Sequence, residues 1–331
     1  MGDATITFGE LGINEITHPV KLTNDKGTTS IKTDWNSPYI AGAIIDGVES
    51  GNHAAVSGNH GTSGGDGFAT ANTRSTEVKV DDRLISNSYS GLAKKIEVTI
   101  VNEVTLKENI NLTNGVRNSV DFIETTVYVI EHNHMRIKDV SLEALTPMYI
   151  TTYMGPQFTR EYNDKMYFTY DEVQSLVYTN TGTRINSGTK SESPNMTRST
   201  MMNDNNELLH VYVDKNYGIG YDHIGDNGVP AYMRENYGKF YYHLIKTGQT
   251  LTFNAGDVNS YRGGYIFAED TGTNAYVSRF VENGVKKAFV DFRLAATERI
   301  DYTSIEDSVG VTGNGTSLTA STNNAYAKVV I

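Results

Sequence analysis

The chain has 331 residues, of which 38% are hydrophobic and 20% are charged, and its 21 tyrosines can help to fill a wide core. Its net charge of −11 disfavours a nucleic-acid partner, because such binding relies on many Lys and Arg contacts to phosphates. The sequence has no cysteine, which excludes disulfides and thiolate-bound metals, and no apolar run is long enough to span a membrane.

Residues 1–73 are rich in Gly, Asn and Ser, which favour turns and loops. The tetrapeptide Ser-Gly-Asn-His occurs at residues 50–53 and again at residues 57–60. Six glycines lie between residues 51 and 67, so a long loop is predicted over residues 50–73. The opening residues lack the basic and apolar regions of a signal peptide.

From Arg74 onward, apolar residues alternate with polar ones in one short segment after another. This period of two is typical of antiparallel strands that bury one face. In the first half of the chain the alternating residues are Val78 and Val80, Ile96, Val98 and Ile100, Val104 and Leu106, Val120 and Phe122, Val127 and Val129, Met135 and Ile137, and Val140 and Leu142.

The middle of the chain departs from this pattern. Residues 170–177 place Val173, Leu176 and Val177 on one helical face and predict a short helix, and residues 179–206 predict a long surface loop. Alternation then resumes at Leu209, Val211 and Val213, Phe240, Tyr242 and Leu244, Leu251 and Phe253, Tyr265 and Phe267, Val290, Phe292 and Leu294, and Ala327, Val329 and Ile331.

So many alternating segments cannot form one open sheet without curling or splitting into two layers. We therefore predict an all-β fold, a large antiparallel two-sheet β-sandwich of the supersandwich kind with long Gly/Asn-rich loops. No break in composition divides the chain, so residues 1–331 are expected to form a single domain. Within it, residues 1–73 form a loop-rich N-terminal part and residues 74–331 the main sandwich.

Several stretches of the sequence resemble one or the other of two known families. Tyr237–Ile245 followed by Thr250–Asp257, together with residues 124–158, resembles the strands near the end of galactose-mutarotase-like β-supersandwich domains. Residues 57–80 resemble segments of tail and appendage proteins of phages of Gram-positive bacteria. The first resemblance implies a His and Glu acid–base pair on a concave face, but no two residues here can be matched to that pair.

Residues 61–65, Gly-Thr-Ser-Gly-Gly, match the nucleophile-elbow pattern G-x-S-x-G. That chemistry needs a strand before the serine and a helix after it, and no helical pattern follows here. A flexible glycine loop is therefore the preferred interpretation.

His132 and His134 form an H-x-H pair that could bind a transition metal if both lay on one face of a strand. A polar hairpin turn explains the same residues, and no second pair at ligand spacing supports a metal. We expect neither a metal nor another cofactor.

A polar site is predicted where His53, His60, Asp66 and Arg74 could meet at the end of a sheet, because acid–base chemistry needs a His near a carboxylate. Solubility of the loop would explain the same residues. Aromatic and polar side chains also gather in three other segments, where tyrosine rings could stack on sugars and the charged groups could bind hydroxyls. The alternative is that alternating tyrosines only cover a half-buried sheet. The segments contain Tyr153, Arg160 and Tyr162; Tyr217, Tyr221, Asp222 and His223; and Tyr261, Arg262 and Tyr265.

These features favour a carbohydrate-binding or cell-surface-binding protein, a phage tail or bacterial surface appendage component that recognises cell-wall or capsular polysaccharide. We expect an extracellular or virion location, no membrane insertion and a homo-oligomer that gains strength from multivalency. A polysaccharide-active enzyme, a lyase before a hydrolase, and a purely structural virion protein are the alternatives. An enzyme would use His60, Arg74, Tyr153 and His223, and the expected ligand-binding residues are His53, Asp66, Arg160, Tyr162, Tyr221, Asp222, Tyr261 and Arg262.

Overall fold

The protein folds almost entirely into β-strands, with a single 3-10 turn at Lys107–Asn109 among the described residues. This confirms the predicted all-β class. No described helix is long and apolar enough to cross a membrane. The computed structural model describes residues 5–10, 13–23, 30–33, 35–57, 67–131, 134–160, 165–170, 173–179, 196–202, 207–214, 217–219, 231–234, 239–245, 248–270, 275–282, 284–292, 294–323 and 325–331.

The first sheet contains ten strands in the described part of the chain, and its main path runs β1-β2-β3-β12-β18-β17. The strands β4 and β19 also pair with β12, and β5 and β6 pair with β4. The strands are β1 (Thr5–Glu10), β2 (Thr17–Thr23), β3 (Ser30–Thr33), β4 (Pro38–Ile45), β5 (Val48–Glu49), β6 (Ala54–Ala55), β12 (Met148–Arg160), β17 (Ala231–Arg234), β18 (Lys239–His243) and β19 (Leu251–Phe253).

The second sheet contains fourteen described strands along the path β14-β13-β15-β16-β20-β11-β10-β9-β7-β8, and β21, β22, β27 and β24 continue it from β20. These strands are β7 (Ala71–Val80), β8 (Arg83–Leu84), β9 (Ile96–Val104), β10 (Phe122–Glu131), β11 (His134–Ala144), β13 (Lys165–Tyr170), β14 (Val173–Thr179), β15 (Met196–Met202), β16 (Glu207–Val213), β20 (Val258–Asp270), β21 (Ala275–Glu282), β22 (Val285–Phe292), β24 (Ser304–Val309) and β27 (Tyr326–Val330).

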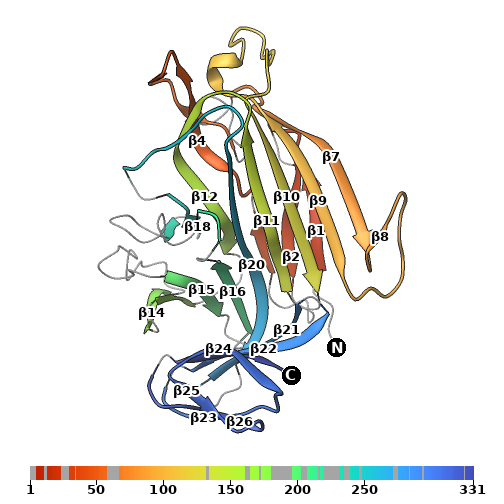
Figure 1. Ribbon diagram of the computed structural model, residues 1–331, viewed down its shortest axis with the longest axis vertical. Coiled ribbons are helices and arrows are strands. Elements are labelled where there is room, and N and C mark those ends of the chain that lie inside the picture. The colour runs from red at the N-terminus through yellow and green to blue at the C-terminus, as the bar shows by residue number, and fades with distance from the viewer. Residues whose placement is uncertain are drawn as a thin grey trace.

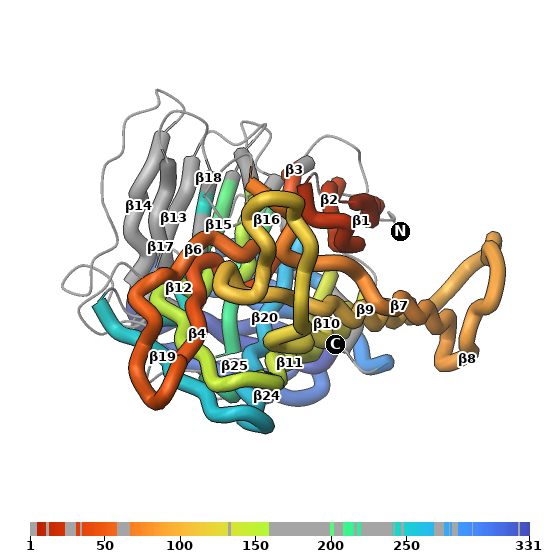
Figure 2. Tube along the Cα trace, turned by 90° about the horizontal axis from the view of Figure 1, so that it is seen from above, coloured from red at the N-terminus to blue at the C-terminus, as the bar shows by residue number. Residues whose placement is uncertain are grey.

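The two sheets pack face to face, with β1 and β2 lying across from β9 and β10 (Figures 1 and 2). The ring of Phe8 in β1 meets the ring of Tyr128 in β10 edge to face at 5.8 Å between centroids. In β9, alternate residues such as Val98 and Ile100 are buried between the layers while their neighbours face outward. The sequence alternation therefore becomes an inner apolar face and an outer polar face.

The C-terminal strands build a second hydrophobic cluster. There β21, β22 and β27 pack against a third sheet with the order β23-β26-β25. This part lies at the bottom of the molecule in Figure 1. The third sheet consists of β23 (Thr297–Arg299), β25 (Val311–Gly313) and β26 (Ser317–Ala320).

Three local predictions differ from the structure. The helix predicted over residues 170–177 is wrong, because β13 and β14 form an antiparallel pair there, with Tyr170 opposite Val173. The long loop predicted over residues 179–206 contains β15, which is polar in sequence but pairs with both β13 and β16. The N-terminal part, expected to be rich in loops, contributes the six strands β1–β6. The secondary structure of these segments depends more on pairing with other strands than on the pattern of their own residues.

The two ends of the molecule differ. The segment of residues 105–121, which joins β9 to β10, lies at the top in Figure 1, where β7 begins and β9 ends. The C-terminus lies in the lower half, near β22 and β24.

Candidate functional site

Several residues that the sequence singles out lie outside the described residues, so their roles stay predictions. Arg160 ends β12, but its side chain is also outside the described part. The others are His60, Asp66, His132, Tyr162, Tyr221, Asp222 and His223.

Tyr153 and Tyr261 belong to the core. They are 1% and 0% exposed, and their rings meet edge to face with 5.8 Å between centroids. The Tyr261 hydroxyl donates to the carbonyl of Asn36 at 3.0 Å, and burial raises the pKa of both phenols. At these two positions the alternating tyrosines fill the sandwich, as the alternative interpretation of the sequence had it.

The two described histidines of interest lie in different places. His134 is 2% exposed, and its Nε2 lies 2.8 Å from the hydroxyl of Tyr212. His53 is exposed, with its Nδ1 3.4 Å from the hydroxyl of Tyr149. Within the described ranges, no three His, Cys, Asp or Glu side chains gather in a way that could hold a metal ion.

Arg262 lies on the outer face of the second sheet and stacks on an aromatic ring. Its guanidinium carbon is 3.5 Å from the centre of the Tyr217 ring, and the Tyr217 hydroxyl donates to Asp139 at 3.1 Å. Arg262 belongs to β20 and Asp139 to β11, so this cluster lies on strands other than those that form the pocket described next.

An open pocket lies where β7 begins and β9 ends, against the segment of residues 105–121. Its volume is about 300 Å³. Amide, carboxylate, hydroxyl and guanidinium groups all contribute to its lining, so it offers both donors and acceptors. The lining residues are Asn72, Glu103, Thr105, Arg117, Asn118, Ser119 and Val120.

Strand register brings two of these residues together. Asn72 in β7 lies directly opposite Glu103 in β9, so their side chains share one face of the sheet. That face is the outer one, because the neighbouring Asn102 is 2% exposed and points into the sandwich. The amide and the carboxylate therefore reach solvent side by side.

A β-bulge directs Arg74 toward the same place. Thr73 lies opposite Asn102 and Ser75 lies opposite Val101, so Arg74 is the extra residue of β7. A bulge changes the direction in which a side chain points and often occurs beside functional sites. The Nη1 of Arg74 lies 3.8 Å from Oε1 of Glu103, so the structure brings this predicted residue next to the carboxylate of the pocket.

The segment of residues 105–121 is held in place by the fully buried Asp121. The carboxylate of Asp121 accepts hydrogen bonds from the backbone N–H of Leu106 at 2.7 Å, the amide of Asn109 at 2.6 Å and the hydroxyl of Thr146 at 3.0 Å. The backbone N–H of Asn118 then donates to the carbonyl of Asn109 at 2.8 Å. These bonds fix the backbone that carries the pocket residues.

The tip of this segment depends on a glycine. Gly115 has φ +74°, a conformation that L side chains rarely adopt, and a Cβ there would lie 2.5 Å from the ring of Phe68. The side chain of Asn111 accepts a hydrogen bond from the N–H of Thr113 at 2.9 Å and so closes a local turn. The Asn- and Gly-containing sequence therefore folds into a tight turn above the pocket.

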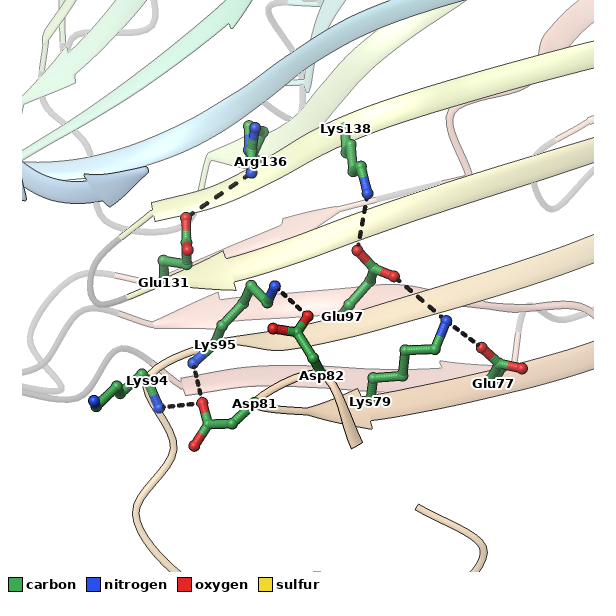
Figure 3. Close-up of polar contacts among 10 residues, drawn as sticks. All are labelled: Glu77, Lys79, Asp81, Asp82, Lys94, Lys95, Glu97, Glu131, Arg136 and Lys138. Atoms are coloured by element: carbon green, nitrogen blue, oxygen red, sulfur yellow. Dashed lines mark hydrogen bonds and ion pairs between the residues drawn. The ribbon is translucent and has the colours of Figure 1, made fainter. Parts of the chain in front are cut away.

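Ion pairs cover the outer face of the second sheet below the pocket (Figure 3). Lys138 of β11 reaches Glu97 of β9 at 3.0 Å, and Lys79 of β7 contacts Glu77 at 2.8 Å and Glu97 at 3.8 Å. Arg136 lies 3.9 Å from Glu131. The pairs of Lys79 and Lys138 are partly exposed and contribute little to stability, so the outer face below the pocket is in contact with water there, whereas Glu131 is only 2% exposed.

A second polar cluster lies inside the sandwich. Glu124 of β10 is 0% exposed; its Oε1 accepts a hydrogen bond from the indole N–H of Trp35 at 2.5 Å, and the Asn102 amide lies 3.4 Å away. Burial raises the pKa of the Glu124 carboxyl to about 7, and hydrogen bonds from its neighbours oppose part of that rise. Gln157 donates to the carbonyl of Trp35 at 2.8 Å and joins the same network.

The open pocket is suited to recognition of a ligand rich in hydroxyl groups. Sugar hydroxyls both donate and accept, and the amides and carboxylate of the pocket match them. Hydrolysis of a glycosidic bond commonly needs two carboxyl groups on either side of it. The described lining of the pocket holds one carboxyl group, that of Glu103, which lies next to the guanidinium of Arg74 and not next to a second carboxyl group.

Sequence reasoning found Arg74 but not the residues beside it. Asn72 and Glu103 are 31 positions apart and meet only through the register of β7 and β9. One signal was present: residues 111–119 form a polar Asn/Ser/Gly-containing stretch between two alternating segments, which is the usual setting of a binding loop.

Comparison with known proteins adds only distant structural likenesses. No protein-family model matches the sequence, and no curated protein matches it. GH36 α-galactosidase AgaA from Geobacillus stearothermophilus, in a complex with raffinose, aligns over 81% of this chain with 9% identity and a TM-score of 0.46. AgaB from the same organism aligns over 81% of this chain with 8% identity and a TM-score of 0.47.

The chain covers 40% of the AgaA structure and 39% of the AgaB structure. At this level of similarity the two structures carry no argument about what this chain binds or catalyses. The resemblance to phage tail proteins rests on the sequence segments alone.

Proposed function

We propose that this protein is a carbohydrate-binding β-sandwich protein and that its open pocket between β7, β9 and residues 105–121 binds the sugar. The observation that carries the proposal is the convergence of Asn72, Glu103 and Asn118 on one solvent-open pocket. Two amides and a carboxylate can accept from and donate to several hydroxyls at once, while the anchored backbone around Asp121 limits the ordering cost of binding.

A shallow pocket of this kind gives weak binding at each site. We propose that the protein acts as a homo-oligomer, so that several pockets bind one repetitive polysaccharide and the total affinity rises through effective concentration. A cell-wall or capsular polysaccharide has the required repetition. The absence of cysteine and the polar outer face support work outside the cytoplasm, as a component of a phage tail or a surface appendage.

The proposal is tested by screening the purified chain on an array of bacterial and plant oligosaccharides and measuring the hits by calorimetry. Changing both Asn72 and Asn118 to Ala removes two amides from the pocket and should weaken binding about tenfold or more, at the usual net value of a hydrogen bond. The control is Asn87→Ala, an exposed asparagine in the segment after β8, which should bind as the wild type does.

An array without any bound sugar, or unchanged affinity in the double variant, would contradict the proposal. Ultraviolet absorbance in the presence of uronic-acid polysaccharides tests the enzymatic alternative at the same time. A rising signal would mean that the protein is a lyase, whereas binding with a flat signal supports recognition alone.

A further inference from the structure

We propose that the pocket selects acidic sugars and that Arg117 binds their anionic group, a carboxylate or a phosphate. This inference rests on the proposed carbohydrate-binding function and names its ligand class. It starts from the position of Arg117, which is half-buried in the lining of the pocket.

The guanidinium of Arg117 differs from the other cations of this region. Arg74 lies 3.8 Å from Glu103, Lys138 lies 3.0 Å from Glu97, and Lys79 lies 2.8 Å from Glu77. In the part of the chain that the structure describes, the guanidinium of Arg117 forms no ion pair with a carboxylate and no hydrogen bond. A half-buried guanidinium whose five donors have no partner among the described residues is available to a ligand.

The backbone that carries Arg117 is fixed before any ligand arrives. Arg117 and Ile110 form an antiparallel bridge across the segment, and the N–H of Asn111 donates to the carbonyl of Val116 at 2.8 Å. The neighbouring Asn118 is held by its bond to Asn109. A charged group on a fixed backbone loses less freedom on binding than one on a loose loop.

The charges around the pocket favour one acidic group. Arg117 and Arg74 supply two positive charges, and Glu103 supplies one negative charge that Arg74 partly compensates. A guanidinium can bind a carboxylate or a phosphate through two parallel hydrogen bonds, and Asn72 and Asn118 remain free to bind the hydroxyls of the same sugar. The net charge of −11 acts over a longer range and is screened beyond about 8 Å at physiological salt, so it does not cancel the local preference.

The test compares three ligands by calorimetry: a galacturonic acid trimer, the galactose trimer with the same linkage, and that galactose trimer carrying a phosphate group. The wild type should bind at least one of the two anionic ligands about tenfold more tightly than the neutral trimer, as expected for a charge-assisted pair. Whichever anionic ligand binds better identifies the source of the acidic group.

Arg117→Gln should reduce the affinity for the acidic ligand about tenfold and leave the affinity for the neutral trimer unchanged. Arg117→Lys keeps the charge without the paired donors and should retain part of the preference. The matched control is Arg299→Gln, an exposed arginine in the third sheet, which should change nothing. Melting temperatures equal to that of the wild type verify that all three variants are folded.

Equal affinity for acidic and neutral sugars, or an Arg117→Gln variant that keeps the acidic preference, would overturn this inference while leaving carbohydrate binding intact. Failure of the wild type to bind any saccharide would overturn both this inference and the proposed function.

Discussion

Two polar clusters lie on opposite sides of the second sheet, and neighbouring residues of one strand contribute to both. Asn102 points inward beside Glu124, whereas Glu103 points outward into the pocket. The same happens in β7, where Asn72 lines the pocket and the hydroxyl of Thr73 donates to Asn102 at 2.8 Å. Each cluster contains a carboxylate and an amide, yet one is sealed and the other is open.

The difference shows that residue types alone do not separate a structural cluster from a binding site. Inside, burial raises the pKa of the Glu124 carboxyl to about 7, and the carboxyl accepts a hydrogen bond from the indole N–H of Trp35. Outside, Glu103 is solvated and lies near Arg74. We therefore expect changes to the inner cluster to alter stability and changes to the outer cluster to alter ligand binding.

The largest effect is expected from Trp35→Ala. Trp35 is 2% exposed and fills the space between the sheets beside Glu124, so its removal leaves a cavity and a carboxyl without its donor. The free energy of unfolding should fall by about 3–5 kcal/mol, measured by urea denaturation followed by circular dichroism. Leu92→Ala, at a side chain that is 94% exposed, is the control and should change stability by less than about 0.5 kcal/mol. A small loss in Trp35→Ala would mean that the inner cluster is not structural.

The second effect is a dependence of stability on pH. The pKa of Glu124 is about 7 in the folded protein, against 4.5 for an unperturbed glutamate carboxyl. Between these values the unfolded chain loses the proton while the folded chain keeps it, so the free energy of unfolding falls as pH rises from about 4.5 to about 7 and then levels off. The total loss from this group should be about 3 kcal/mol.

Glu124→Gln isolates this contribution, because the amide keeps the size of the side chain and cannot ionise. The difference in unfolding free energy between the variant and the wild type should grow through that pH window and stay constant above it. Trp35 offers an independent readout, since the chain has one tryptophan and its N–H bonds to the titrating group. Parallel pH curves for the two proteins would show that the titrating group is a different one.

The smallest effect on stability is expected from Glu103→Gln in the outer cluster. Its pair with Arg74 is long, and the Arg74 side chain is 59% exposed, so the change should alter the free energy of unfolding by less than about 0.5 kcal/mol. Calorimetry on a neutral saccharide should instead show weaker binding, because a carboxylate is a stronger acceptor for sugar hydroxyls than an amide is. A large loss of stability in this variant would remove the distinction between the two clusters.

The alternation of apolar and polar residues predicted the sandwich, because the geometry of a strand places successive side chains on opposite faces. The segments at residues 96–106 and 120–144 became β9, β10 and β11 with the predicted residues, such as Ile100 and Leu142, buried. Strands β13, β14 and β15 were missed because their sequences are short and polar or spaced like a helix, and only their pairing with one another makes them strands.

The candidate site was predicted only at Arg74. The sequence could not show that Arg74 is the extra residue of a bulge, since a bulge is defined by the register of the neighbouring strand. Nor could it show that Tyr153 and Tyr261 face inward, because a tyrosine suits either side of a half-buried strand. The sequence pattern predicted which residues of a strand face inward and which face outward. It could not predict which loop lies beside which strand.

The arrangement of the chain ends has a practical consequence. The segment of residues 105–121, which lines the pocket, lies at the end of the molecule opposite to the C-terminus (Figure 1). A fusion partner, biotin tag or sensor surface attached at the C-terminal end would therefore lie far from the segment of residues 105–121 and would leave it accessible.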